Sequence, residues 1–114
     1  MVTLWFPVNR PVGPDCGTIS VIPASHKEGR RPADTYLRGG YFRQIEAKPS
    51  EREAADEQAL GLQLGDCCVM DGNLLHRSVA NRSATPRVAA VARLVHLAKL
   101  HSYDRERFYC VHKA

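Results

Sequence analysis

The chain has 114 residues, of which 44% are hydrophobic and 25% are charged. This balance is typical of one soluble globular domain and excludes a disordered segment, a collagen-like repeat and a coiled coil. No apolar run approaches the ~20 residues that a membrane-spanning helix needs, so no membrane partner is expected. The N-terminus carries no visible secretory signal, and we expect the protein to be cytoplasmic.

The net charge is +4, and the basic excess is concentrated between residues 27 and 43, where five basic side chains accompany two acidic ones. This segment is either a solvated surface loop or a site that attracts phosphate- or carboxylate-bearing ligands. The few aromatic residues are not interleaved with the basic ones, so no nucleic-acid partner is expected. The four cysteines lack metal-binding spacing and are predicted to be buried free thiols.

Two strands are predicted in the N-terminal half. Residues 2–8 are rich in β-branched and aromatic side chains, and residues 18–22 form a second β-branched run after a turn region rich in proline and glycine. Residues 25–57 follow as a long, polar, lid-like loop. Within it, Ser50 and Glu53 match a capping box and predict one short helix.

The C-terminal half contains the remaining predicted strands, at residues 58–64, 67–71, 74–79 and 87–97. The sequence Asp71-Gly72-Asn73 is a hairpin-type turn signal between two of them. Residues 87–97 are rich in alanine and valine, so a helix is an alternative there. The tail, residues 99–114, has no assignment. Many short strands separated by turns predict a β-sandwich, barrel or jelly roll.

Three motifs, in this order, carry a resemblance to a known family. Trp5 and Pro7 lie in the first strand, C-G-T-I-S-V-I-P-A-S-H-K-E-G spans Cys16–Gly29, and a G-D turn leads to H-R-S, followed by an arginine eleven residues after the histidine. The chain resembles the C-terminal part of the phytanoyl-CoA dioxygenase (PhyH-like) family of iron(II)- and 2-oxoglutarate-dependent oxygenases. The resemblance implies an all-β fold: a double-stranded β-helix, or cupin-like jelly roll, truncated at its N-terminus. Residues 1–114 would then form a single partial dioxygenase domain.

The resemblance also implies roles for individual residues. His76 matches the family's distal metal histidine, and Arg87 matches the arginine that binds the far carboxylate of 2-oxoglutarate, a task suited to the guanidinium fork. Ser78 shares the strand face of His76 and would add a hydroxyl contact to that carboxylate. Trp5 would pack near the pocket. The alternatives are a surface or core histidine, an exposed arginine and a serine that is merely small.

The family's first metal pair, H-x-D, would precede the tryptophan-bearing strand, where this sequence has four residues before Trp5. We therefore expect one histidine of the two-histidine, one-carboxylate set, with iron(II) bound weakly or not at all by this chain alone. His26 and Glu28 read as H-x-E and are an alternative pair, although their motif places them one strand later. Strands left without partners are expected to associate edge to edge with other copies of the chain.

Three hypotheses for the function follow. In the first, the complete protein couples oxidative decarboxylation of 2-oxoglutarate to hydroxylation of a small organic or acyl substrate, including anionic ones, and this chain alone is inactive. In the second, the chain is a non-catalytic, truncated remnant. In the third, it is a metal-free, cupin-like module that binds an organic acid through Arg87.

Overall fold

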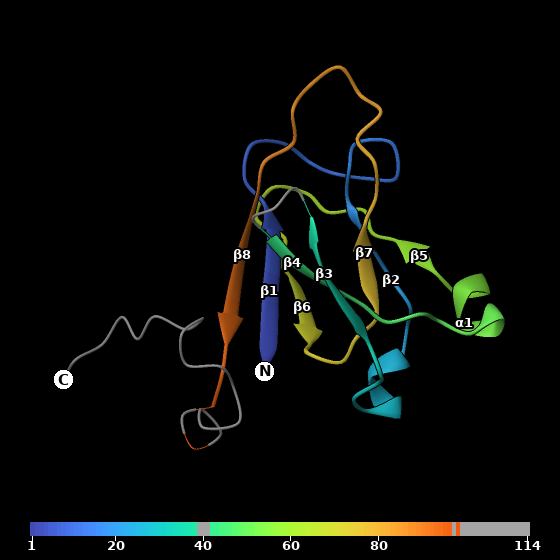
Figure 1. The fold of residues 1–114 in the computed structure, drawn as a ribbon. Helices are drawn as coiled ribbons and strands as arrows, with labels where there is room; N and C mark the ends of the chain where they lie inside the picture. Colours follow the sequence, from blue (N-terminus) through green and yellow to red (C-terminus); the bar gives the residue numbers. More distant parts are fainter. Residues whose placement is uncertain (39–41, 97, 99–114) are drawn as a thin grey trace.

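The computed structural model describes residues 1–38, 42–96 and 98. These residues form eight strands and two short helices (Figure 1). In chain order the elements are β1 (Val2–Pro7), β2 (Ile19–Val21), the 3-10 helix η1 (Ser25–Glu28), β3 (Asp34–Arg38), β4 (Phe42–Glu46), α1 (Glu51–Ala55), β5 (Gln58–Ala59), β6 (Cys68–Asp71), β7 (His76–Ser78) and β8 (Ala89–Leu94).

Two small antiparallel sheets form the body of the fold. Sheet I has the strand order β6-β1-β8, and sheet II has the order β5-β2-β7. Trp5 and Met70 of sheet I share a buried cluster with Ile19 of sheet II and Val12 of the first long loop. The sheets therefore pack face to face over one apolar core. The predicted mainly β class is confirmed, and the arrangement is compatible with a jelly roll.

The strand register shows which side chains of sheet I face this core. Side chains directly opposite each other on antiparallel strands lie on the same face, so Trp5 shares its face with its partners Cys68 and Val91. Thr3 likewise shares that inner face with Met70 and Arg93. Even-numbered residues of β1, and their partners, form the outer face.

The polar segment 25–57 contains more structure than the predicted loop. Strands β3 and β4 form an antiparallel ribbon within it, from the pair Asp34 and Glu46 to the pair Arg38 and Phe42. The sequence prediction missed these strands because polar side chains interrupt their apolar pattern. Helix α1 has the predicted capping box, since Ser50 Oγ accepts from Glu53 N at 3.3 Å and Ser50 N donates to the Glu53 carboxylate at 3.0 Å.

All six predicted strands are shorter in the structure, and those at 58–64 and 87–97 differ most from the prediction. Strand β5 covers only the first two residues of 58–64, after which Leu62 exchanges backbone hydrogen bonds with Val12 of another loop. β8 is a strand, so the helical alternative for 87–97 is wrong, and the pairing with β1 is what decides between the two. Residue 97 and the tail at 99–114 lie outside the described residues.

The turn Asp71-Gly72-Asn73 reverses the chain but does not form a hairpin. β6 belongs to sheet I and β7 to sheet II, so this turn connects the two sheets instead. Asp71 Oδ1 accepts from Asn73 N at 2.8 Å, while Gly72 N donates to the Met1 carbonyl at 2.9 Å. The local turn chemistry was predicted, but the hairpin was wrong because tertiary contacts decide which strand each arm pairs with.

The described cysteines are free thiols, but they are not all buried. Cys16 and Cys68 are half-buried, and Cys67 is exposed, which contradicts the predicted burial at that position. Cys67 precedes the first residue of β6 and so lies outside the core pattern. Burial raises the pKa of the Cys68 thiol, and the neighbouring Cys67 adds to this effect. Within the described residues, no helix is long and apolar enough to cross a bilayer.

Gly17 is at a position where a side chain does not fit. Its φ is +78°, and a Cβ there would lie 2.8 Å from Asn81 Cβ. We expect Gly17→Ala to lower the free energy of unfolding by about 1–3 kcal/mol, because it adds both backbone strain and a steric clash. Gly13→Ala is the matched control, since a Cβ at Gly13 meets nothing within 4 Å. Equal urea midpoints for the two variants would contradict the assignment.

An ion pair fastens the segment before β3 to helix α1. Both terminal nitrogens of Arg31 donate to the Glu53 carboxylate, which also accepts from Ser50. The Arg31 hydrogen bonds, and then those from Ser50, lower the pKa of Glu53 from 4.5 to about 2. The carboxylate form is therefore favoured in the folded state.

This pKa predicts a pH dependence. Because the folded-state pKa is lowered, the stabilisation from Glu53 is complete above pH 4.5 and is lost as the pH falls from there toward about 2. We expect Glu53→Gln to flatten the pH dependence of unfolding across that window and to leave its shape at neutral pH unchanged. Urea denaturation at several pH values measures this. Parallel curves for the wild type and the variant would contradict it.

Candidate functional site

β7 places His76 and Ser78 on the inner face of sheet II. His76 is opposite Val21 and Ser78 is opposite Ile19, a core residue, so all four side chains lie on the face that turns toward sheet I. Both polar side chains are nevertheless exposed, because β7 is an edge strand of its sheet. The site residues therefore line the inner face where it remains accessible to a ligand.

The imidazole of His76 has a defined orientation. Its Nδ1 lies 2.8 Å from the carbonyl oxygen of Leu74. A carbonyl can only accept a hydrogen bond, so Nδ1 carries a proton, and in the neutral ring Nε2 is then the nitrogen with the lone pair. An imidazole oriented in this way by a backbone carbonyl is the form that binds metal ions.

Arg77, between these two residues, points to the opposite face and anchors the strand. Its Nε lies 2.6 Å from Glu57 Oε1, and its Nη2 donates to Glu57 Oε2 at 3.0 Å. Hydrogen bonds from Arg77, and then from Ser20, lower the pKa of Glu57. Because Glu57 directly precedes β5 and Ser20 lies in β2, the ion pair spans the sheet and fixes β7 in register.

Arg87 lies just before β8 and contacts Trp5 of sheet I. It lies two residues before Ala89, the partner of Pro7, and its guanidinium carbon is 5.6 Å from the centre of the Trp5 ring. This contact is a cation–π interaction with a buried indole. The Arg87 Nε is buried and has no hydrogen-bond partner. A buried N–H without an acceptor is costly, so this guanidinium is suited to receive an oxyanion.

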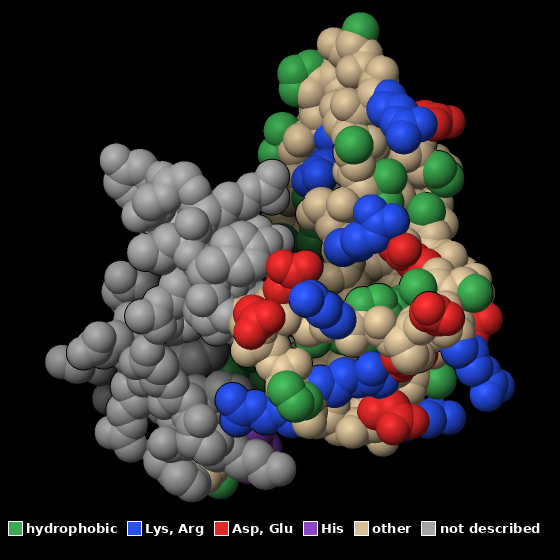
Figure 2. Space-filling model, turned by 45° about the vertical axis from the view of Figure 1, so that its right-hand side comes forward, with side chains coloured by type: hydrophobic (Ala, Val, Ile, Leu, Met, Phe, Trp, Pro, Cys, Tyr) green, Lys and Arg blue, Asp and Glu red, His purple; other side chains and the backbone are tan. Residues whose placement is uncertain are grey.

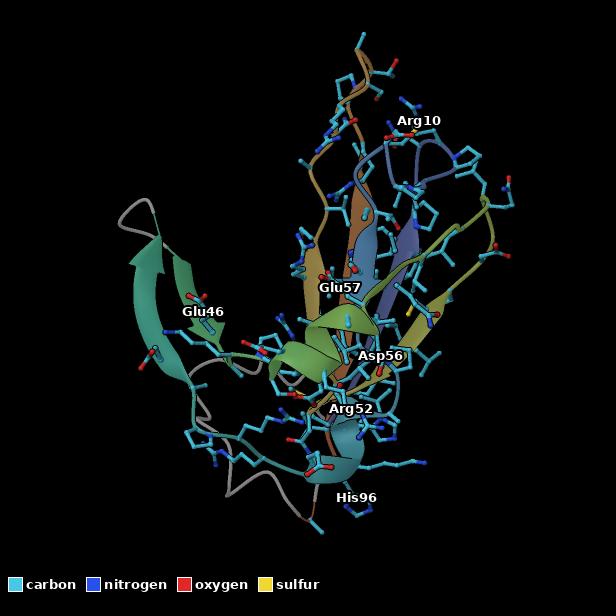
Figure 3. All side chains as sticks on the ribbon, turned by 90° about the vertical axis from the view of Figure 1, so that its right-hand side faces the viewer. Arg10, Glu46, Arg52, Asp56, Glu57 and His96 are labelled. Atoms are coloured by element: carbon cyan, nitrogen blue, oxygen red, sulfur yellow. The ribbon has the colours of Figure 1, made fainter. Side chains whose placement is uncertain are left out.

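The ribbon shows how β7 and β8 are related along the length of the strands. β7 runs toward the end at which β8 begins (Figure 1), so the Ser78 end of β7 is nearer than the His76 end to the start of β8. Arg87 precedes that start by two residues. In Figure 3 the β3–β4 ribbon stands apart from both sheets.

The basic segment does not form a surface of one sign. Lysine and arginine side chains alternate with acidic ones over the lower described surface in Figure 2. Arg30, Lys48 and Arg52 share one groove with Glu28 and Glu46. Of the two interpretations of the sequence, this mixture of charges favours a solvated surface over a strong anion site.

The residues fit 2-oxoglutarate better than they fit iron. Arg87 and Ser78 supply donors for a carboxylate, whereas His76 supplies one of the three donors of the expected set. Among residues 1–38, 42–96 and 98, no group of three or more His, Cys, Asp and Glu side chains could hold a metal ion. His26 and Glu28 lie two positions apart in η1, so their side chains diverge by about two-thirds of a turn and do not form a pair.

A comparison with family models decides the relationship. The model of the phytanoyl-CoA dioxygenase (PhyH) family matches residues 1–89. The chain belongs to the phytanoyl-CoA dioxygenase family. The matched range includes His76, Ser78 and Arg87, and membership supports an iron(II)- and 2-oxoglutarate-dependent dioxygenase function at the level of the family. The comparisons with curated proteins and with solved structures gave no match.

Sequence reasoning missed two features of this family member's site. The first is the Arg77–Glu57 ion pair, which joins residues 20 positions apart and has no local signal. The second is the register of Arg93 in β8, which is opposite Thr3 and so belongs to the inner face of sheet I.

Proposed function

We propose that this chain is the part of an iron(II)- and 2-oxoglutarate-dependent dioxygenase that holds the far carboxylate of 2-oxoglutarate and supplies one metal-binding histidine. The observation that carries this proposal is the buried Nε of Arg87, which has no hydrogen-bond partner and belongs to a guanidinium that lies over the Trp5 ring. The complete reaction converts 2-oxoglutarate, dioxygen and a C–H substrate into succinate, carbon dioxide and the hydroxylated product.

In this proposal each residue has a separate task. Arg87 Nε and one terminal nitrogen donate to the two oxygens of the carboxylate, and Ser78 Oγ donates a third hydrogen bond. Trp5 supports the flat guanidinium from one side and excludes water from it. His76 presents Nε2 as a metal donor, and the β3–β4 ribbon with its flanking segments would cover the substrate.

The remaining two metal donors would come from an H-x-D pair encoded ahead of residue 1. Reading the same frame upstream of Met1 tests this. The proposal predicts an H-x-D pair there, on a segment whose addition makes the protein bind iron(II) tightly. If the frame contains no such pair, the enzymatic proposal is contradicted, and either the remnant or the metal-free module that binds an organic acid through Arg87 takes its place.

The substrate, partners and compartment are part of the same proposal. We propose a small, anionic organic substrate and a cytoplasmic location, in keeping with the free thiols of the described cysteines. We also propose that copies associate along β8, which pairs only with β1 among the described strands and carries the half-exposed residues Val91 and Leu94. A monodisperse monomer in size-exclusion chromatography would contradict this association.

A further inference from the structure

Arg93 is a second arginine on the inner wall of β8. It is opposite Thr3, a buried residue that also faces Met70, so the register assigns its side chain to the inner face. Arg87 precedes the other end of the strand by two residues and contacts Trp5, which belongs to the same face. Six residues of extended chain span about 20 Å, which is longer than one five-carbon dicarboxylate.

Residues labelled in Figure 3 give the order of these groups by height in the molecule. Arg10, which donates to the Thr85 carbonyl at 3.3 Å, marks the end near Arg87, and His96 marks the opposite end, three residues after Arg93. Glu57, the partner of Arg77 in β7, is at a height between them. His76 is next to Arg77, so β7 carries it at a height between the two ends of β8.

The side chain of Arg93 is more exposed than that of Arg87 and takes part in no ion pair within the described residues. Its side chain is exposed, and neither of the two ion pairs described for residues 1–38, 42–96 and 98 includes it. By contrast, Arg87 is half-buried against Trp5. An exposed cation on this face, with no acidic partner among the described residues, is available to a ligand.

We propose that Arg93 is a specificity-determining residue that binds an oxyanion of the substrate, a carboxylate or a phosphate, on the side of His76 away from Arg87. The inference rests on the proposed function, in which Arg87 holds 2-oxoglutarate. The oxyanion on Arg93 would direct the rest of the substrate along the inner wall toward His76. Val91, half exposed on the same face between the two arginines, supplies an apolar surface for the intervening carbon chain.

Hexanoate and hexyl phosphate are suitable probes of this site, with hexan-1-ol as their uncharged counterpart. Binding to the full chain can be followed by protein-detected NMR titration. We expect both anions to bind more tightly than the alcohol. Arg93→Gln should lower the affinity for both anions by about five- to tenfold and leave the affinity for the alcohol unchanged. Arg82→Gln, which removes an exposed charge from a distant loop, is the matched control. The anion with the higher affinity indicates whether the substrate group at Arg93 is a carboxylate or a phosphate.

The same titration separates the two proposals. If Arg93→Gln and the wild type bind hexanoate and hexyl phosphate equally, or if hexan-1-ol binds the wild type as tightly as the anions do, the role of Arg93 is overturned. A parallel titration with 2-oxoglutarate should respond to Arg87→Gln but not to Arg93→Gln. Loss of 2-oxoglutarate binding in Arg93→Gln would overturn the separation of the two sites. Failure of the wild type to bind 2-oxoglutarate would overturn the proposed function instead.

Discussion

Met70→Ala is expected to lower the free energy of unfolding by about 2–5 kcal/mol, which is a large share of the stability of a domain of this size. Met70 is only 2% exposed and packs from β6 into the cluster that joins the two sheets. Removing its side chain leaves a cavity between Trp5 and Ile19, because neighbours on two hydrogen-bonded sheets can relax only in part. Urea denaturation followed by circular dichroism measures the loss.

Val69→Ala is the matched control for this experiment. Val69 is the preceding residue of the same strand, but it lies on the outer face of sheet I and is 65% exposed. Its truncation should change the free energy of unfolding by about 0.5 kcal/mol or less. If the two variants lost equal stability, the core would not lie between the sheets as described, and the inner-face assignments of the site would lose their basis.

Arg87→Gln has the largest expected effect on binding. The substitution removes the charge and the fork geometry from the wall above Trp5, so we expect the affinity for 2-oxoglutarate to fall by about 10- to 100-fold. Isothermal titration calorimetry on the full chain measures it. The fold should not suffer, because the buried Nε that lacks a partner in the free protein is replaced by an uncharged amide.

The control for Arg87→Gln removes the same charge from a neighbouring loop. The Arg82 backbone N donates to Asp15 O, while its side chain is exposed, so Arg82→Gln should leave the binding of 2-oxoglutarate nearly unchanged. An equal loss in both variants would indicate general electrostatic attraction rather than a specific anchor. An unchanged affinity in Arg87→Gln would remove Arg87 from the site.

Local patterns explain how much of this fold the sequence could predict. Runs of β-branched and aromatic residues predicted β1 and β2 to within a residue or two, and the Ser50–Glu53 capping box predicted α1, because each signal is contained within a single segment. For residues 87–97 the local pattern left strand and helix open, and the pairing of β8 with β1 decided between them. The relation of β6 to β7 depends instead on contacts with β1 and β2, which are distant in sequence. Turn chemistry at Gly72 could therefore predict a reversal but not the change of sheet.

In the candidate site, too, local patterns predicted some features, whereas others depend on contacts between segments distant in sequence. Motif spacing selected His76, Ser78 and Arg87, and the common face of the first two followed from the period of a strand. The contact of Arg87 with Trp5 joins residues from opposite ends of the matched range and needed the pairing of β8 with β1. The sequence could not single out Arg93, because which face of sheet I is the inner one is known only from the packing of the two sheets.

The central claim is that Arg87 and Trp5 form the anchor for 2-oxoglutarate, and the chain contains a direct reporter of it. Trp5 is the only tryptophan in the sequence, and its ring lies 5.6 Å from the Arg87 guanidinium carbon. Titration of the wild type with 2-oxoglutarate, followed by tryptophan fluorescence, should give a saturable change that is lost in Arg87→Gln and retained in Arg82→Gln. A fluorescence that does not respond in the wild type, or that responds equally in Arg87→Gln, would contradict the account.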